Sequence, residues 1–135
     1  MDSIDFKSVG VVGIGIDLCD VKRVQNLLDK HSDSFIKTAF TQNEASYCSK
    51  KANPAIHYAA RFAAKEAMAK ALGTGFSNGI TLKSLSVEND ENGAPYAVLD
   101  SIAQKRVEEL GGDKMLISLT HLSEYAQAFA ILTKK

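Results

Sequence analysis

The sequence predicts an α+β fold in which one long buried helix packs on a small, mainly antiparallel sheet. Two observations predict it: helical patterns dominate the first half of the 135 residues, and β-type alternation dominates the second half. The composition, with 45% hydrophobic and 24% charged residues, is typical of a globular protein. Because this length suits one domain with a sizeable core, we expect a single domain spanning residues 1–135.

The first 50 residues predict one strand and two short helices. A run of Val, Ile and Gly over residues 9–17 is typical of a buried strand, and its three glycines indicate close approach of another backbone segment. Asp20 can cap a helix that runs to about residue 30. Thr41 begins a capping-box pattern that opens a second helix, which we expect to end near residue 50.

The longest helical signal covers residues 55–72, between a break at Asn53-Pro54 and a stop at the Gly-Thr-Gly of residues 73–75. Its apolar residues lie on nearly every side, which is typical of a buried helix. The same segment carries four charged residues, and burial of unpaired charges costs several kcal/mol. These residues are Arg61, Lys65, Glu66 and Lys70. We therefore expect each of them to have a partner in the fold.

The second half predicts strands with one further helix. Alternating residues over 80–87 and 96–99 flank a turn rich in Asn and Gly, which predicts a hairpin. A helix is expected over residues 101–110, before Gly-Gly. Two last strands are expected over 115–119 and 125–132.

Charge and hydropathy exclude several classes of function. The 16 basic and 16 acidic residues cancel, so the chain has no overall basic footprint for nucleic acid. No apolar run is long enough to span a membrane, and the N-terminal residues do not form a signal-peptide pattern. Cys19 and Cys48 lack metal-site spacing, so we expect free buried thiols in a cytoplasmic protein.

The charges are nevertheless unevenly distributed. Residues 50–83 carry six basic residues and a single acidic one, Glu66. Glu66 and Lys70 share one face of the predicted helix because they lie at positions i and i+4. Two interpretations stay open for them: an ordinary surface ion pair, or a Mg²⁺ ligand beside a phosphate-binding lysine.

Two other candidates each have two interpretations. Asp17 ends the glycine-rich strand, where it is either a capping or turn residue or a ligand that projects into a crevice. His121 follows a predicted strand and is either a site residue or a turn histidine. His31 and His57 show no ligand spacing and are expected on the surface.

Four motifs occur in a characteristic order. They are GIGID at 13–17, RFAAKEAMAKALGTG at 61–75, NGAP at 92–95 and SLTH at 118–121. Together they resemble the bacterial holo-acyl-carrier-protein synthases, which are small 4′-phosphopantetheinyl transferases, and the resemblance spans nearly the whole chain. It implies the phosphopantetheinyl transferase fold and a homotrimer with active sites between subunits.

The resemblance also implies a reaction. The family transfers 4′-phosphopantetheine from coenzyme A to a serine of apo-acyl carrier protein in fatty acid biosynthesis, depends on Mg²⁺, and releases adenosine 3′,5′-bisphosphate. By this resemblance Asp17 and Glu66 hold the metal and take part in catalysis with Lys70, which stabilises charge on the phosphates. Arg23 and Lys22 resemble the family's docking surface for the acidic carrier protein. The implied coenzyme A contacts are Arg61, Gly73, Thr74, Gly75, Asn92, Gly93, Pro95 and His121.

One departure and two alternative functions bear on this interpretation. Ala94 stands where many family members carry lysine, so a charge contact to coenzyme A is lost there. A non-catalytic module that only binds coenzyme A or carrier protein is one alternative, although Asp17, Glu66 and Lys70 are all retained. A nucleotide-binding regulatory protein is the other, but Gly10, Gly13 and Gly15 do not have the spacing of a dinucleotide fingerprint.

Overall fold

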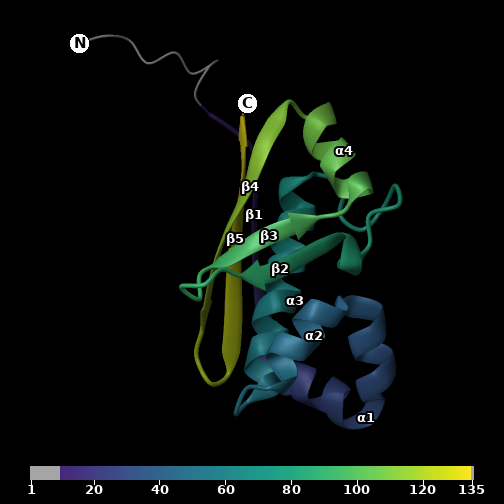
Figure 1. The fold of residues 1–135 in the computed structure, drawn as a ribbon, viewed down its shortest axis with the longest axis vertical. Coiled ribbons are helices and arrows are strands. Elements are labelled where there is room, and N and C mark those ends of the chain that lie inside the picture. The colour runs from purple at the N-terminus through teal and green to yellow at the C-terminus, as the bar shows by residue number, and fades with distance from the viewer. Residues whose placement is uncertain (1–9, 135) are drawn as a thin grey trace, which may run out of the picture.

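The computed structural model describes residues 10–134, so the predicted strand position Val9 lies outside the described residues. Strands and helices follow the predicted order, with one added 3₁₀ turn, η1 (Figure 1). They are β1 (Val11–Asp20), α1 (Val21–Ala39), α2 (Gln42–Ser49), α3 (Pro54–Ala71), η1 (Leu82–Ser84), β2 (Leu85–Asn89), β3 (Pro95–Leu99), α4 (Ser101–Glu109), β4 (Gly112–His121) and β5 (Tyr125–Lys134). The α+β class predicted from the sequence is confirmed.

The strands form two antiparallel sheets rather than the single small sheet expected. One has the order β1-β5-β4, so the first strand pairs with the last, and the other is the β2-β3 hairpin. Figure 1 shows the three-stranded sheet along one side of the molecule, with α3 beside it and the hairpin across the helix. No helix within residues 10–134 is long and apolar enough to cross a membrane.

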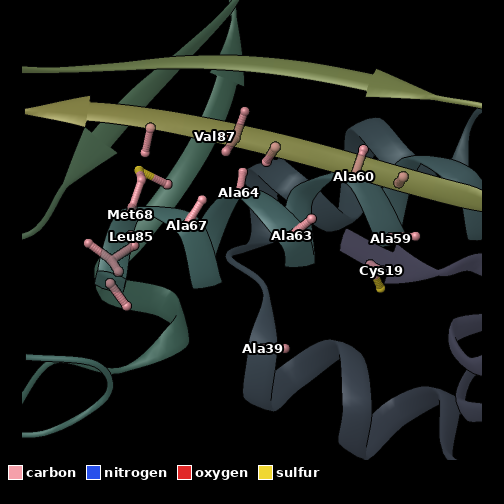
Figure 2. Close-up of a cluster of buried hydrophobic side chains, with 14 of the residues drawn as sticks. Cys19, Ala39, Ala59, Ala60, Ala63, Ala64, Ala67, Met68, Leu85 and Val87 are labelled. Carbon is pink, nitrogen blue, oxygen red and sulfur yellow. The ribbon is translucent and has the colours of Figure 1, made fainter. Parts of the chain in front are cut away.

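Small residues allow α3 to lie very close to the three-stranded sheet. A Cβ atom on Gly15 would lie 1.8 Å from the Ala67 carbonyl oxygen, and one on Gly13 would lie 1.9 Å from that of Ala71. Alanines on α3 and β5 extend the same close contact, and Figure 2 shows several of those on α3 within the core. The expected close backbone approach is therefore confirmed, and it accounts for the glycines of β1.

The boundaries of several elements differ from those predicted. Helix α1 continues to Ala39 across a kink at His31, where φ is −139° and ψ is 38°. The sequence pattern weakens at this kink, but Phe35 and Ile36 beyond it pack against the core. Tertiary contacts therefore stabilise a helical segment that local periodicity did not show.

The predicted hairpin strand over 80–87 begins later, at Leu85. Thr81 and Ser84 form a reciprocal capping box around η1, which occupies positions 82–84 of the predicted strand. Strand β4 is longer than expected, and His121 is its last residue rather than a residue beyond it. Strand β1 is buried on one face only, because its alternate residues Ile14 and Ile16 are exposed.

Candidate active site

The buried lysine of α3 is fully satisfied. Lys65 Nζ lies 2.6 Å from Glu44 Oε1 and donates to the carbonyl oxygens of Leu82 and Leu85 at 2.9 and 3.0 Å. The other Glu44 oxygen accepts the Val87 backbone N–H at 2.9 Å. Burial lowers the pKa of Lys65, and the negative charge of Glu44 opposes this effect. This ion pair joins α2 and α3 to β2 and leaves Lys65 no capacity for a substrate.

A second group of charges, which we call the acidic cluster, consists of Asp17, Arg23, Glu66 and Lys70. Lys70 Nζ lies 3.3 Å from Asp17 Oδ1 and donates to the Ile16 carbonyl oxygen at 2.8 Å. Burial raises the pKa of Glu66, Asp17 raises it further, and Lys70 and Arg23 oppose these effects. Lys70 thus forms hydrogen bonds with β1 in addition to sharing a helix face with Glu66.

The capping role considered for Asp17 belongs instead to Asp20. The Asp20 side chain accepts from the Lys22 backbone N–H at 2.9 Å and caps α1. Asp17 lies inside β1 and points toward α3, because it has the same strand parity as Gly13 and Gly15. Its carboxylate is therefore free of backbone capping and available to the acidic cluster.

The donor set of the acidic cluster fits Mg²⁺. Mg²⁺ prefers carboxylate oxygens and is usually bound by one or two of them together with waters and substrate phosphates. Asp17 and Glu66 supply two carboxylates that interact electrostatically. Within residues 10–134, no three His, Cys, Asp or Glu side chains gather as a closed metal site would require. Asp17 and Glu66 are therefore the residues that could hold this metal.

A third group, which we call the basic cluster, consists of Tyr47, Lys51, His57, Arg61 and His121. Arg61 is only 3% exposed, and its guanidinium carbon lies 4.0 Å from the centroid of the Tyr47 ring. The His57 ring packs edge-on against Tyr47 at 6.0 Å and against His121 at 5.8 Å. Burial lowers the pKa of His57, and the neighbouring charges of the cluster lower it further. His57 is half-buried beside Tyr47 and His121, whereas His31 is exposed as expected.

The Asn92–Pro95 turn is tied to the basic cluster through Asn89. The Asn89 side chain accepts a hydrogen bond from Arg61 and donates to the Gly93 carbonyl oxygen at 3.0 Å. Asp90 Oδ1 accepts the backbone N–H groups of Asn92 and Ala94, each at 2.9 Å. Ala94 thus holds the turn through its backbone, so the absence of a lysine there does not disturb the geometry.

A cavity of about 530 Å³ opens beside the basic cluster. It is lined by Asn43, Ser46, Tyr47, Lys50, Lys51, Arg61, Val87, Glu88 and Asn89. Three of these residues carry positive charge and one, Glu88, carries negative charge, so the positive excess suits an anion such as a phosphate group.

The Gly-Thr-Gly loop follows directly on α3. Gly73 and Gly75 have φ values of +74° and +58°, in the left-handed region that favours glycine. Thr74 Oγ1 donates to the Gly75 carbonyl oxygen at 2.9 Å, and Arg106 Nε donates to the Leu72 carbonyl oxygen at 3.0 Å. The loop is therefore held at the end of α3 that lies beyond Lys70.

The two docking candidates lie in the first turn of α1, and both are exposed. Arg23 also lines a small pocket between α1 and α3 with the apolar side chains of Leu27, Phe35 and Phe62. Its charge lowers the pKa of Glu66, so it lies near that carboxylate. A partner bound at Arg23 would therefore lie beside Asp17 and Glu66.

The acidic and basic clusters of one chain are separate. The charges that act on Glu66 come from Asp17, Lys70 and Arg23, whereas those that act on His57 come from Lys51, His121 and Arg61. The two sets share no residue. Successive residues on a helix are turned by about 100°, so the line His57–Arg61 and the line Phe62–Glu66–Lys70 face different directions.

Sequence reasoning missed several residues of the basic cluster and its partner Asn89. Tyr47, His57 and Asn89 belong to no recognised motif, and the only signal that included Lys51 was the basic stretch over 50–83. Free buried thiols are confirmed at Cys19 and Cys48. Burial is the main cause that raises their pKa values to about 11 and about 12, so neither thiol is an activated nucleophile.

Comparison with known proteins finds relatives that span nearly the whole chain. Residues 13–130 match the family model of the 4′-phosphopantetheinyl transferase superfamily. The chain is 44% identical to a holo-[acyl-carrier-protein] synthase of Protochlamydia amoebophila over 89% of this chain and 96% of that protein. It is 46% identical to one of Syntrophus aciditrophicus over 90% of this chain and 95% of that protein.

Solved structures show the same fold. A holo-[acyl-carrier-protein] synthase of Neisseria meningitidis superimposes with a TM-score of 0.83 and 30% identity, covering 90% of this chain and 98% of that one. One of Bacillus anthracis, solved in complex with coenzyme A (3′,5′-ADP), has a TM-score of 0.76 and 31% identity, covering 93% of this chain and 98% of that one.

Proposed function

Because the chain belongs to the 4′-phosphopantetheinyl transferase superfamily and its relatives are holo-[acyl-carrier-protein] synthases, we propose that it transfers 4′-phosphopantetheine from coenzyme A to a serine of apo-acyl carrier protein. The observation that carries the proposal is the acidic cluster, in which Asp17, Glu66 and Lys70 meet from two elements. We place this reaction in fatty acid biosynthesis in the cytoplasm.

The acidic cluster accounts for the chemistry. The serine oxygen forms a bond to the phosphorus of the pantetheine arm, and the bond from that phosphorus to the oxygen of adenosine 3′,5′-bisphosphate breaks. Asp17 or Glu66, directly or through a water, takes the serine proton, and the raised pKa of Glu66 suits that role. Lys70, whose side chain is 54% exposed, can donate to the phosphate oxygens. Mg²⁺ held by the two carboxylates would neutralise charge on the pyrophosphate when bound.

The other candidate contacts serve binding. Arg61, the Asn92–Pro95 turn and His121 lie in or beside the basic cluster, where they would contact coenzyme A together with the Gly73-Thr74-Gly75 loop. Arg23 and Lys22 would dock the acidic carrier protein next to the acidic cluster. The phosphates of coenzyme A would thus approach the reaction centre from the basic cluster, and the carrier protein would approach it from α1.

We propose further that three chains assemble so that the acidic cluster of one faces the basic cluster of the next. The outer face of the three-stranded sheet supports this, because large apolar side chains on it are 39–62% exposed. They include Ile14, Ile16, Leu18, Leu116 and Phe129. The register places Ile16 opposite Phe129 and Ile14 opposite Ile131, so they form one continuous surface that a second copy could cover.

A non-catalytic module that binds coenzyme A is the alternative function. The basic cavity alone would support it, since anion binding needs no carboxylate pair. The acidic cluster favours the enzyme, because a module that only binds an anion gains nothing from Asp17 and Glu66.

Intact-mass measurement of the carrier protein tests the proposal. After incubation of the protein with apo-acyl carrier protein, coenzyme A and Mg²⁺, we expect the carrier to gain the mass of one phosphopantetheine. Chelation of the metal should abolish the gain. Glu66→Ala should reduce the rate by about a hundredfold or more, because a metal ligand and a candidate base are lost together.

Lys50→Ala serves as a control in the same assay. Lys50 is exposed and lines the cavity away from the acidic cluster, so this variant should raise KM for coenzyme A and still label the carrier fully at saturation. Absence of labelling by the unaltered protein on several apo-carriers, with coenzyme A still bound, would favour the binding module instead.

A further inference from the structure

The cavity beside the basic cluster is lined by positively charged side chains that lie close to one another. Lys51 and Arg61 both line it, and their positive charges repel each other. One side chain contacts both of them: the Tyr47 ring centroid lies 4.0 Å from the Arg61 guanidinium carbon and 4.5 Å from Lys51 Nζ. Both distances are within the reach of a cation–π interaction, about 6 Å.

The backbone that carries Tyr47 is itself fixed. Tyr47 lies three residues after Glu44 on α2, and Glu44 is bound by the Thr41 backbone N–H at 3.0 Å and by Lys65 at 2.6 Å. The His57 ring packs edge-on against Tyr47 from α3. The aromatic ring is therefore held by contacts from both α2 and α3.

The Arg61 guanidinium is held in place but has an unused donor. One terminal nitrogen bonds to the Asn89 side chain, and the planar group lies over Tyr47. Its Nε is buried and finds no hydrogen-bond partner among residues 10–134. A buried donor without a partner costs about 1–3 kcal/mol, so the ring contact with Tyr47 and the bond to Asn89 are the contacts that hold this side chain in place.

We propose that Tyr47 is a positioning residue that aligns Arg61 and Lys51, through its ring, toward the phosphate groups of coenzyme A. The inference rests on the proposed function and deepens it, since it names a side chain outside every motif as a determinant of affinity for coenzyme A. Tyr47 itself takes no part in the bond changes. Its contribution comes from the ring, so phenylalanine should replace it and aliphatic or amide side chains should not.

Steady-state kinetics with Tyr47→Leu and Tyr47→Phe tests the proposal. We expect Tyr47→Leu to raise KM for coenzyme A by about fivefold to tenfold, because two cation–π contacts are lost. The kcat value and KM for apo-acyl carrier protein should change by less than about twofold, since the acidic cluster is untouched. Tyr47→Phe should restore KM for coenzyme A to nearly the original value.

Two results would overturn the proposal. Equal KM values for Tyr47→Leu and Tyr47→Phe would show that the ring does not position the cations. Equal rises in both KM values with a fall in kcat would show a general structural defect. Tyr47→Gln replaces Tyr47→Leu if the latter does not fold, because its amide keeps a polar group at a half-buried position.

A double-mutant cycle adds a second measurement. Lys51 is exposed, so Lys51→Met should fold normally. We expect this change to raise KM for coenzyme A more in the presence of the Tyr47 ring than in the ring-free variant, because the ring positions the lysine. Strictly multiplicative effects would contradict the proposal.

A binding experiment separates this inference from the proposed function. Adenosine 3′,5′-bisphosphate is the probe, and calorimetry measures its Kd without any turnover. If the unaltered protein labels no carrier, the proposed function fails, whereas weaker binding of the probe by Tyr47→Leu than by Tyr47→Phe still supports the role of Tyr47. If labelling is normal and the two variants bind the probe equally, only the inference about Tyr47 fails.

Discussion

Gly15 determines how closely β1 can lie against α3. A side chain at this position would place its Cβ atom 1.8 Å from the Ala67 carbonyl oxygen, a distance that backbone atoms do not tolerate. Asp17 stands two residues further along the same strand face, and Glu66 immediately precedes Ala67 on the helix. The separation of the two carboxylates therefore depends on the absence of a side chain at Gly15.

Gly15→Ala should lower the free energy of unfolding by about 3 kcal/mol, because the strand must move away from a fixed helical backbone. Denaturant unfolding at a constant protein concentration measures this change. Gly111→Ala is the matched control: its Cβ would meet nothing within 4 Å, but its φ of +72° predicts a cost of only about 1 kcal/mol. Equal losses for the two variants would contradict the argument.

Individual residues also show what a sequence can reveal about a site. Glu66 and Lys70 were recognisable because helical spacing places them on one face, and Asp17 because it follows a glycine-rich strand. Tyr47 and Asn89 were not, since their roles arise from contacts with Arg61, which lies 14 and 28 positions away. Such contacts depend on how α2 and the hairpin pack on α3, and local pattern carries no information about that packing.

At the scale of elements, caps and breaks were the most reliable predictors. Asp20, Thr41 and Asn53-Pro54 begin helices where the sequence indicated, because their signals act through adjacent backbone groups. The continuation of α1 past His31 was missed, because the core contacts of Phe35 and Ile36 stabilise it. The fold class and element order could thus be predicted, and the boundaries set by tertiary packing could not.

Helix α1 is the element on which carrier docking can be tested. Arg23 lies in its first turn and is the exposed member of the acidic cluster on this helix, so Arg23→Glu should raise KM for apo-acyl carrier protein by about tenfold. KM for coenzyme A should change little, since the basic cluster lies on another face of α3. Steady-state kinetics with each substrate varied in turn measures both values.

A lysine on another helix provides the control for this experiment. Lys105→Glu makes the same charge reversal on α4, and Figure 1 shows α4 and α1 toward opposite ends of the molecule. It should leave KM for the carrier within about twofold of the original value. Equal effects of Arg23→Glu and Lys105→Glu would assign the loss to net charge rather than to docking.

At the scale of the whole molecule, one chain carries two charged clusters that face different directions. The acidic cluster lies where α3 meets β1 and α1, whereas the basic cluster lies where α3 meets α2 and β4. The apolar outer face of the three-stranded sheet offers a surface through which copies could join. The proposed ring of three chains, in which neighbours complete each site, would use both features.

Mixing two inactive variants tests the shared site. Glu66→Ala damages the acidic cluster and His121→Ala the basic one. In randomly mixed trimers made from equal amounts, about a quarter of the original activity should return, because each mixed ring contains one undamaged pair of clusters. Size-exclusion chromatography before and after dissociation and reassembly shows that the chains have exchanged.

The control for mixing combines both substitutions in one chain. Rings formed from Glu66→Ala and the double variant Glu66→Ala/His121→Ala contain no undamaged acidic cluster, so they should stay inactive. Failure of the first mixture to regain activity after verified exchange would place each site within one chain.

The separation of the two clusters also has a genetic consequence. In a ring of three, a chain damaged in one cluster disables a single site, whereas a chain damaged in both disables two, one on each side of it. A cell that expresses such a doubly damaged copy beside an intact one would lose more activity than the share of damaged chains. The arrangement of charges around α3 would then decide whether a mutation is recessive or dominant.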